Sequence, residues 1–319
     1  MVYGARMRTP TGASDAGFRH EALLYTGADD FAARALPIIG RAVEAGEPVL
    51  VAVDAEKMDL LRDRLGGAAR SVAWKDIRGI GANPARIIPV WRQFIRGHRS
   101  GGRLWGFGEP IWAGRSPAEL VEAQRHERLL NLAFADAPPF TLICPYDTDG
   151  LDPEVIREAH RSHPFVDGGA GHGSNGGCPG LQAIWAPAGD PLPEPRGEPS
   201  HLVLDSVGGA ALRRFLVDRA GGACLGTERT DDLTVAIAAV ARSMAGPEGR
   251  SRLRLWQEPD AVLAEISGLG AVTDPLAGRE WPAPSHGPAR GLWLANQLCD
   301  LVQLRSSETG AVVRLRVRR

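Results

Sequence analysis

Polar and aromatic side chains lie in or beside several apolar stretches in the N-terminal half of the sequence. They are His20, Tyr25, Asp29, Asp30, Glu109, Trp112, Cys144, Tyr146 and Asp147. The carboxyl ends of parallel strands meet at one edge of a sheet, and ligands bind beyond that edge. We therefore expect a concave polar site with aromatic walls that binds a small organic molecule.

A second group lies on a helix predicted from 117 to 135. Glu122 and His126 are four residues apart and share a face, from which they could hydrogen-bond, line the ligand site or ligate a metal; Arg125 lies beside them. Cys144 is either a small core residue or a thiol paired with His126 as a nucleophile. The four cysteines are far apart and form no CxxC pair, so we expect a reduced protein without a metal centre.

The N-terminal elements alternate in type. Strands are expected at 20–25, 48–54, 71–77, 103–110 and 140–147, and helices at 29–45, 83–98, 117–135 and 152–163. This alternation predicts an α/β domain, with a mainly parallel sheet and helices on both faces.

The C-terminal elements follow a different order. Helices are expected at 211–222 and 231–246, strands at 251–259 and 261–270, a helix at 289–302, and strands at 302–307 and 311–319. This order predicts an α+β domain with helices on one face of a mixed sheet. The basic ending RLRVRR is typical of an edge strand that resists pairing by its charge, rather than of a nucleic-acid site.

Glycine and proline crowd residues 166–199 and mark a boundary. We therefore divide the chain into a loose tail (1–17), an N-terminal domain (18–168), a linker (169–199) and a C-terminal domain (200–319).

The N-terminal domain resembles the methanogen/methylotroph sensory (MEDS) domain over about residues 18–168. The resemblance is carried by HEALLYTGADDF, FGEPIWAGRSPAELVEAQRHERLLN, LICPYD and HRSHP. It implies a sensory role, directed at small organic molecules.

The C-terminal domain resembles the GHKL-type, histidine-kinase-like ATPase domain of anti-sigma factor serine kinases. The segments that carry this are DDLTVAIAAVARSMAG, EISGLGAVTDPLAG and ARGLWLANQLCDLVQLRS. The family's catalytic glutamate and its magnesium-binding asparagine correspond here to Ala239 and Ser243, and its adenine-binding aspartate to Gly268.

The resemblance therefore implies a vestigial ATP pocket made of Ser243, Gly268, Gly270, Arg290 and Gly291. Each lost hydrogen bond weakens binding by about 1–3 kcal/mol. We expect weak or absent binding of ATP and magnesium, no cofactor and no kinase activity.

The net charge of −1 favours neither nucleic acid nor an anionic membrane as a partner. No apolar run is long enough to span a bilayer, and the N-terminus does not resemble a signal peptide, so we expect a cytoplasmic protein. The leading hypothesis is a sensory regulator whose ATPase-like domain binds a sigma factor or an anti-sigma antagonist, with a homodimer as one state it could adopt. The alternatives are a protein serine/threonine kinase that retains ATP binding, a small-molecule enzyme using the N-terminal polar residues, and a scaffold that senses nothing.

Overall fold

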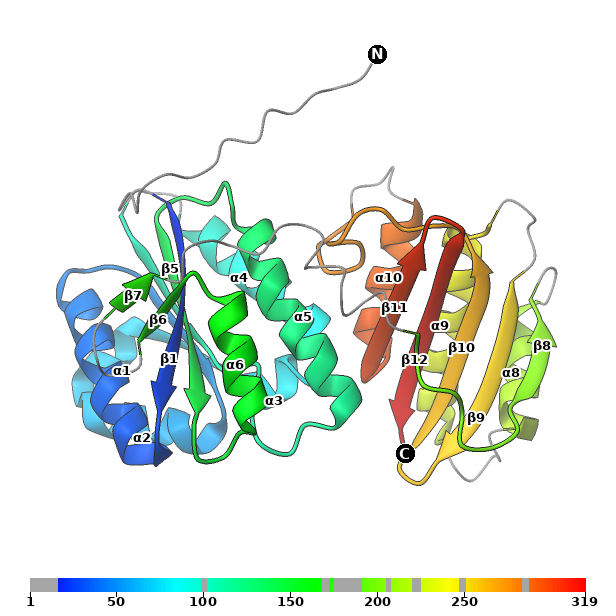
Figure 1. The fold of residues 1–319 in the computed structure, drawn as a ribbon, viewed down its shortest axis with the longest axis horizontal. Coiled ribbons are helices and arrows are strands. Elements are labelled where there is room, and N and C mark those ends of the chain that lie inside the picture. The colour runs from blue at the N-terminus through cyan, green and yellow to red at the C-terminus, as the bar shows by residue number, and fades with distance from the viewer. Residues whose placement is uncertain are drawn as a thin grey trace, which may run out of the picture.

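The computed structural model describes residues 17–98, 102–167, 172–174, 191–204, 208–219, 225–246, 251–282 and 287–319. Two sheets, of seven and five strands, are built from successive parts of the chain (Figure 1). All but the last residue of the predicted tail, and most of the predicted linker, lie outside the described residues.

The first sheet is parallel apart from one short strand. Its strands are β1 (Phe18–Tyr25), β2 (Val49–Val53), β3 (Val72–Asp76), β4 (Leu104–Gly108), β5 (Phe140–Asp147), β6 (Phe165–Asp167) and β7 (His172–Ser174). They run in the order β3-β2-β4-β5-β1-β6-β7, and only β7 is antiparallel to its neighbour. The mainly parallel sheet is confirmed, and β7 extends it into the segment predicted as linker.

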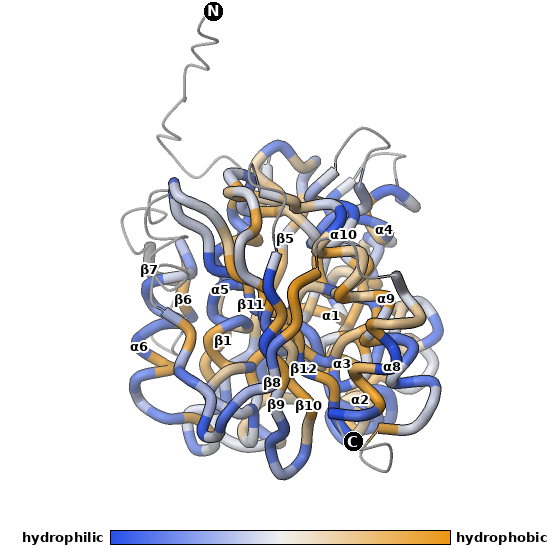
Figure 2. Tube along the Cα trace, turned by 90° about the vertical axis from the view of Figure 1, so that its right-hand side faces the viewer, coloured by the Kyte–Doolittle hydropathy of each residue, from blue (hydrophilic) through white to orange (hydrophobic). Residues whose placement is uncertain are grey.

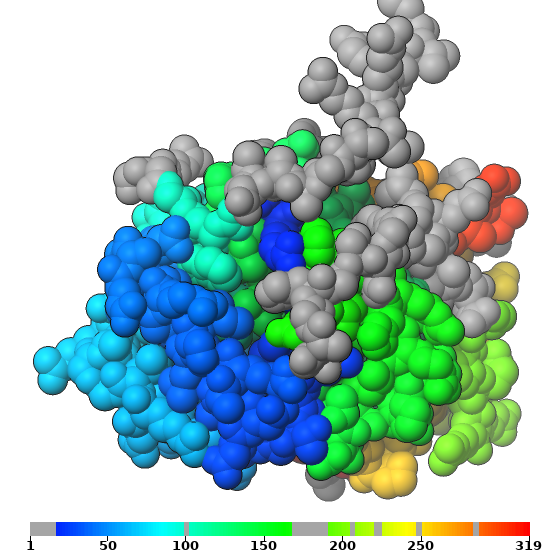
Figure 3. Space-filling model, turned by 60° about the vertical axis from the view of Figure 1, so that its left-hand side comes forward, coloured from blue at the N-terminus to red at the C-terminus, as the bar shows by residue number. Residues whose placement is uncertain are grey.

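Helices cover both faces of this sheet, as predicted. The helical elements are α1 (Gly27–Glu44), α2 (Ala55–Leu65), η1 (Gly66–Ser71), α3 (Ile77–Ile80), η2 (Pro84–Arg86), α4 (Ile87–Gly97), α5 (Pro117–Ala133) and α6 (Pro153–Ser162). One core packs the sheet against α1 and α2, and a second packs it against α4, α5 and α6. Figure 2 shows apolar residues concentrated in the interior and hydrophilic ones along outer helices such as α6. Figure 3 shows the outer surface of both layers, with α1 and α2 in blue and α6 in green.

The second sheet is antiparallel. Its strands are β8 (Ser200–Val203), β9 (Arg252–Glu258), β10 (Ala261–Leu269), β11 (Leu301–Ser307) and β12 (Gly310–Arg318), in the order β11-β12-β10-β9-β8. Every pairing among these described strands is antiparallel, so the predicted mixed sheet is wrong. Short connections join β9 to β10 and β11 to β12, and such hairpins require antiparallel neighbours.

The last strand is not at an edge, which corrects the interpretation of its basic residues. β12 lies between β11 and β10. Its arginines form ion pairs instead: Arg314 contacts Glu265 at 2.5 Å and Arg316 contacts Glu258 at 2.7 Å.

Three helices pack on one face of the second sheet, as predicted. They are α8 (Gly209–Arg219), α9 (Thr227–Ser243) and α10 (Gly287–Leu298). On α9 an apolar stripe at three- and four-residue spacing is buried in their core; its residues are Leu233, Ile237, Val240 and Met244. Among the described helices, none combines the length and apolarity needed to cross a membrane.

Candidate functional site

The structure does not gather the predicted site residues into one concave cluster. Tyr25, Glu109 and Asp147 lie at the carboxyl edge of the first sheet, whereas His20 and Cys144 lie deeper, on the face covered by α5 and α6. Glu122 and Arg125 face the second domain. The single predicted site therefore divides into three clusters.

The carboxyl-edge cluster joins the ends of three strands. Tyr25 on β1 donates a hydrogen bond to Glu109 after β4, with 2.6 Å between the oxygens. The ammonium of Lys57 on α2 lies 2.9 Å from Glu109 and 3.0 Å from Asp54, which follows β2. Asp147 ends β5 beside Tyr25. The shared edge is confirmed.

Burial dominates the electrostatics of this edge. It raises the pKa of Glu109, although the charge of Lys57 and the hydrogen bond from Tyr25 oppose the shift. Burial by itself would lower the pKa of Lys57, but Glu109 and Asp54 outweigh it and raise that pKa. The cluster is therefore an internally paired set of charges.

Asp29, Asp30 and Trp112 do not join this cluster. Asp29 pairs with Arg64 at 2.5 Å, and Asp30 accepts a hydrogen bond from the backbone N–H of Thr26. The Trp112 ring packs against guanidinium groups, with Arg115 3.5 Å and Arg78 4.5 Å from its centroid. The contacts of these three residues therefore account for them without a ligand site.

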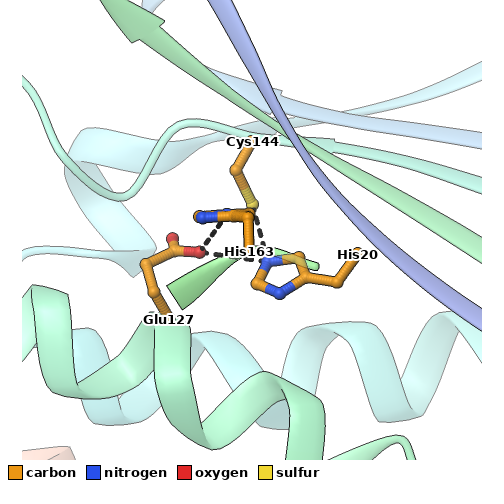
Figure 4. A group of neighbouring side chains, drawn as sticks. All are labelled: His20, Glu127, Cys144 and His163. Carbon is orange, nitrogen blue, oxygen red and sulfur yellow. Dashed lines mark hydrogen bonds and ion pairs between the residues drawn. The ribbon is translucent and has the colours of Figure 1, made fainter. Parts of the chain in front are cut away.

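The second cluster is fully buried and draws on four elements (Figure 4). It comprises His20 on β1, Glu127 on α5, Cys144 on β5 and His163 directly after α6. His20 Nε2 lies 3.1 Å from Glu127 Oε2 and 3.3 Å from Cys144 Sγ. His163 Nε2 lies 3.0 Å from the same carboxylate oxygen. One ligand atom from each residue lies within 4.8 Å of the others.

Hydrogen bonds on the far side of each imidazole orient the rings. The Asn131 amide donates to the carbonyl of Ser162 at 2.9 Å, which directs its Oδ1 toward His20 Nδ1 at 3.1 Å. His163 Nδ1 lies 2.9 Å from the carbonyl of Ala159. Carbonyl oxygens only accept hydrogen bonds, so both Nδ1 atoms carry a proton and both Nε2 atoms point inward.

The pKa values of this cluster follow from its burial and its contacts. Burial lowers the pKa of His20 to about 4. Burial alone would raise the pKa of Glu127, but contacts with His163 and His20 hold it below the usual range. Burial also raises the pKa of the Cys144 thiol. Tyr146 is buried nearby, with its ring edge-on to His163 and its pKa raised by burial.

The third cluster connects the two domains. Glu122 on α5 contacts Arg305 on β11 at 2.9 Å and Arg279 at 3.1 Å, and Arg125 lies 3.7 Å away. Among the described residues His126 hydrogen-bonds neither Glu122 nor Cys144. Glu122 contacts arginines instead, and the Cys144 thiol contacts His20. Neither ring nitrogen of His126 has a hydrogen-bond partner among the described residues. Burial lowers the pKa of His126 to about 3.

A second interdomain contact involves the end of α10. Arg86 donates to the carbonyls of Asn296 at 2.6 Å and Cys299 at 2.8 Å. Asn83 donates to the Asn296 side chain at 3.0 Å. A cation at a helix C-terminus satisfies carbonyls that have no partner within the helix.

Two of the five residues predicted for the vestigial ATP pocket, Ser243 and Gly291, lie where α9 and α10 pack closely. A Cβ atom at Gly291 would lie 1.9 Å from the Ser243 hydroxyl and 2.6 Å from the carbonyl of Ala239. The backbone N–H of Gly270 donates to Met244, and Gly268 and Arg290 are exposed. At Gly291, α10 therefore lies directly against α9.

Two cavities lie at the opposite end of the first sheet from the predicted edge. The larger, about 490 Å³, is lined by Arg19, Glu21, Leu23, Ile38, Arg41, Arg103, Trp105, Thr141 and Ile143. The other, about 360 Å³, includes Glu47, Ser71 and His98. The larger one has the size of a small-molecule site, and three of its lining side chains are arginines.

Residues 19–164 match a family model. It is that of MEDS, described as the methanogen/methylotroph, DcmR sensory domain. The matched range covers every strand of the first sheet up to β5 and ends at α6, so all four residues of the buried cluster fall inside it. The match suggests a sensory or regulatory role. No curated protein is similar enough to the chain to be matched.

Sequence reasoning missed Lys57 and His163 as members of these clusters, and it named Glu127 only as one polar residue of the helix at 117–135. Glu127 is one of several acids on α5, and His163 is one of two histidines near a helix end. Only the tertiary fold shows that they meet His20 and Cys144. The HRSHP segment, already singled out by its resemblance to MEDS, contains His163 and was the available signal.

Proposed function

We propose that the chain is a cytoplasmic sensory regulator in which the N-terminal domain binds a small molecule and the C-terminal domain transmits its state to a protein partner. The observation that carries this proposal is the position of α5. Within nine residues this helix places Glu119 and Glu122 on arginines of the second domain and Glu127 in the buried cluster of the first. A shift of α5 would alter both the contacts with the second domain and the buried cluster of the first.

The larger cavity is the candidate entry point for the sensed molecule. Arg19 pairs with Glu21 and Arg103 donates to Thr141, while Arg41 comes from the last turn of α1. Guanidinium groups favour carboxylates and other anions. Since the matched family is named for methanogens and methylotrophs, we expect a small anionic carbon compound.

The proposed partner is a sigma factor or an anti-sigma antagonist, bound by a GHKL-like domain without kinase activity. The residues at three family positions support this, because Ala239, Ser243 and Gly268 lack the family's acid, amide and carboxylate groups. We expect no phosphotransfer and no ATP binding detectable by calorimetry with magnesium. Micromolar ATP affinity would contradict this part of the proposal.

The sensory part is tested with formate, methanol and methylamine as probes of the full chain. We expect formate to raise the melting temperature, because a ligand that prefers the folded state stabilises it. We also expect formate to change hydrogen exchange in α5 and β11. Arg41→Ala should weaken the effect, whereas Arg64→Ala, outside the cavity, should not.

Transmission is tested with Arg305→Gln, which removes one contact to Glu122. Formate should still stabilise this variant, but exchange in β11 should no longer respond. Arg252→Gln, an exposed change on β9, is the matched control. An unchanged β11 response in Arg305→Gln would refute the proposed route between the domains.

A further inference from the structure

In the buried cluster, two imidazole nitrogens that carry no proton face the same carboxylate oxygen. Both imidazoles carry their proton on Nδ1, so in its neutral form each ring presents a bare Nε2 lone pair. Both lone pairs then face Glu127 Oε2, at 3.1 and 3.0 Å. Lone pairs and a carboxylate oxygen repel unless something positive lies between them.

Two atoms of the cluster also lack hydrogen-bond partners among the described residues. They are Glu127 Oε1 and His163 Nε2, the latter being close to Glu127 but not aligned for a hydrogen bond. Both side chains are completely buried. Unsatisfied buried polar atoms call for a specific explanation, and a bound ion is one.

We propose that His20, Glu127, Cys144 and His163 form a closed, four-coordinate site for a divalent zinc-type metal ion. Imidazole nitrogen, carboxylate oxygen and cysteine sulfur are the donors that Zn²⁺ takes in proteins. In a tetrahedral site such donors lie about 3.3–3.8 Å from one another. Three of the six separations, at 3.0, 3.1 and 3.3 Å, are within a few tenths of an ångström of that range, and all six are within 4.8 Å.

The charges balance in this site. The ion enters as M²⁺, displaces the proton of the Cys144 thiol to solvent, and binds the thiolate, the Glu127 carboxylate and two neutral imidazoles. The net charge is zero, as full burial requires. Asn131 and the carbonyl of Ala159 then serve as the outer partners that metal-bound histidines usually have.

With all four positions filled by protein, the ion is structural. It joins β1, β5, α5 and the residue after α6, and so fixes the position of the helix that contacts the second domain. The proposal stands on ligand geometry alone, independently of the sensory function and of the partner of the C-terminal domain.

The test is uptake of Co²⁺ and Zn²⁺ by the full chain after treatment with a chelator. We expect one ion per chain, a tetrahedral Co²⁺ spectrum with a sulfur-to-cobalt charge-transfer band, and displacement of cobalt by zinc. Cys144→Ser should lose the sulfur band, and Asn131→Ala should weaken binding about 10- to 100-fold. His160→Ala, on the exposed side of α6, is the control and should bind normally.

X-ray absorption of the zinc-loaded wild-type chain identifies the metal ligands directly, so its result does not depend on whether any variant folds. We expect one sulfur neighbour at about 2.3 Å and three nitrogen or oxygen neighbours at about 2.0–2.2 Å. The proposal is overturned if the wild-type chain takes up no ion, if zinc has no sulfur neighbour, or if a folded Cys144→Ser keeps the cobalt band.

Discussion

At the scale of single residues, function depends on which atoms face each other. Glu122 and Glu127 lie five positions apart on α5 and have different surroundings. Glu122 contacts arginines across the domain boundary, and Glu127 contacts two histidines inside the first domain. Helical spacing alone allows Glu122 to pair with His126, but in the fold Glu122 contacts Arg279 and Arg305 instead.

Gly291 provides a prediction at this scale. Replacing a helical glycine by alanine normally stabilises a protein by about 0.8–1.0 kcal/mol. Gly291→Ala should instead destabilise the second domain by about 1–3 kcal/mol, because its Cβ would meet Ser243 and Ala239. Urea unfolding measures the difference.

Gly287→Ala is the matched control on the same helix. Among the residues that the structure describes, its Cβ would meet only the carbonyl of Ser243, at an ordinary 3.7 Å. If both variants gained stability, the close contact between α9 and α10 would be wrong.

At the scale of elements, α5 begins with a capping box. Ser116 and Glu119 exchange hydrogen bonds, and Glu119 also pairs with Arg318 of the second sheet. Burial alone would raise the pKa of Glu119, but these hydrogen bonds and the arginine charge lower it. The stability that Glu119 contributes at the start of α5 therefore depends on pH.

The sign of this linkage gives a pH prediction. A carboxyl group whose pKa is lowered by folding stabilises the protein above its unfolded pKa, about 4.3, and this contribution is lost as pH falls through the folded value. Wild type should exceed Glu119→Gln in stability by about 1 kcal/mol at pH 7, and the gap should close as pH falls below about 4.

Urea denaturation over a pH series measures that gap, with Glu56→Gln on α2 as an exposed control. A gap independent of pH would show that Glu119 acts through packing and not through its charge.

Most elements could be predicted from sequence because their signals are local. The Ser116 cap, the stripe of Leu233 and Ile237, and the alternation of strands and helices each depend on neighbouring residues. The antiparallel direction of the second sheet could have been predicted from the short connections within its two hairpins. The inner position of β12 could not, because it depends on the pairing of β12 with β10, which is distant in the sequence. The same limit applies to the buried cluster, since Cys144 and His163 approach His20 only in the folded chain.

At the scale of the whole molecule, the interface is charged and partly buried. Glu122 is about 1% exposed and faces Arg279, which is about 4% exposed, and burial lowers the pKa of Arg279 to about 9. One carboxylate therefore compensates several guanidinium groups between the domains.

Glu122→Gln should accordingly destabilise the full chain by about 3–5 kcal/mol, because it leaves buried arginines without their counter-charge. Denaturant unfolding, followed by separate probes in each domain, should also show two transitions moving apart. Glu154→Gln removes an exposed carboxylate on α6 and serves as the control. An effect no larger than that of the control would mean that the domains are held by other contacts.

The turn at Pro84–Arg86 has a consequence for how such proteins recombine. Arg86 donates hydrogen bonds to the carbonyls at the C-terminus of α10, which belongs to the second domain. The C-terminal cap of that helix is therefore supplied by the first domain. Grafting residues 200–319 onto a different sensor would leave those carbonyls to water unless the turn were transplanted with them. The C-terminal domain as the sequence delimits it, residues 200–319, therefore lacks a group that its own helix needs, and a unit that folds fully by itself would also include the turn at Pro84–Arg86.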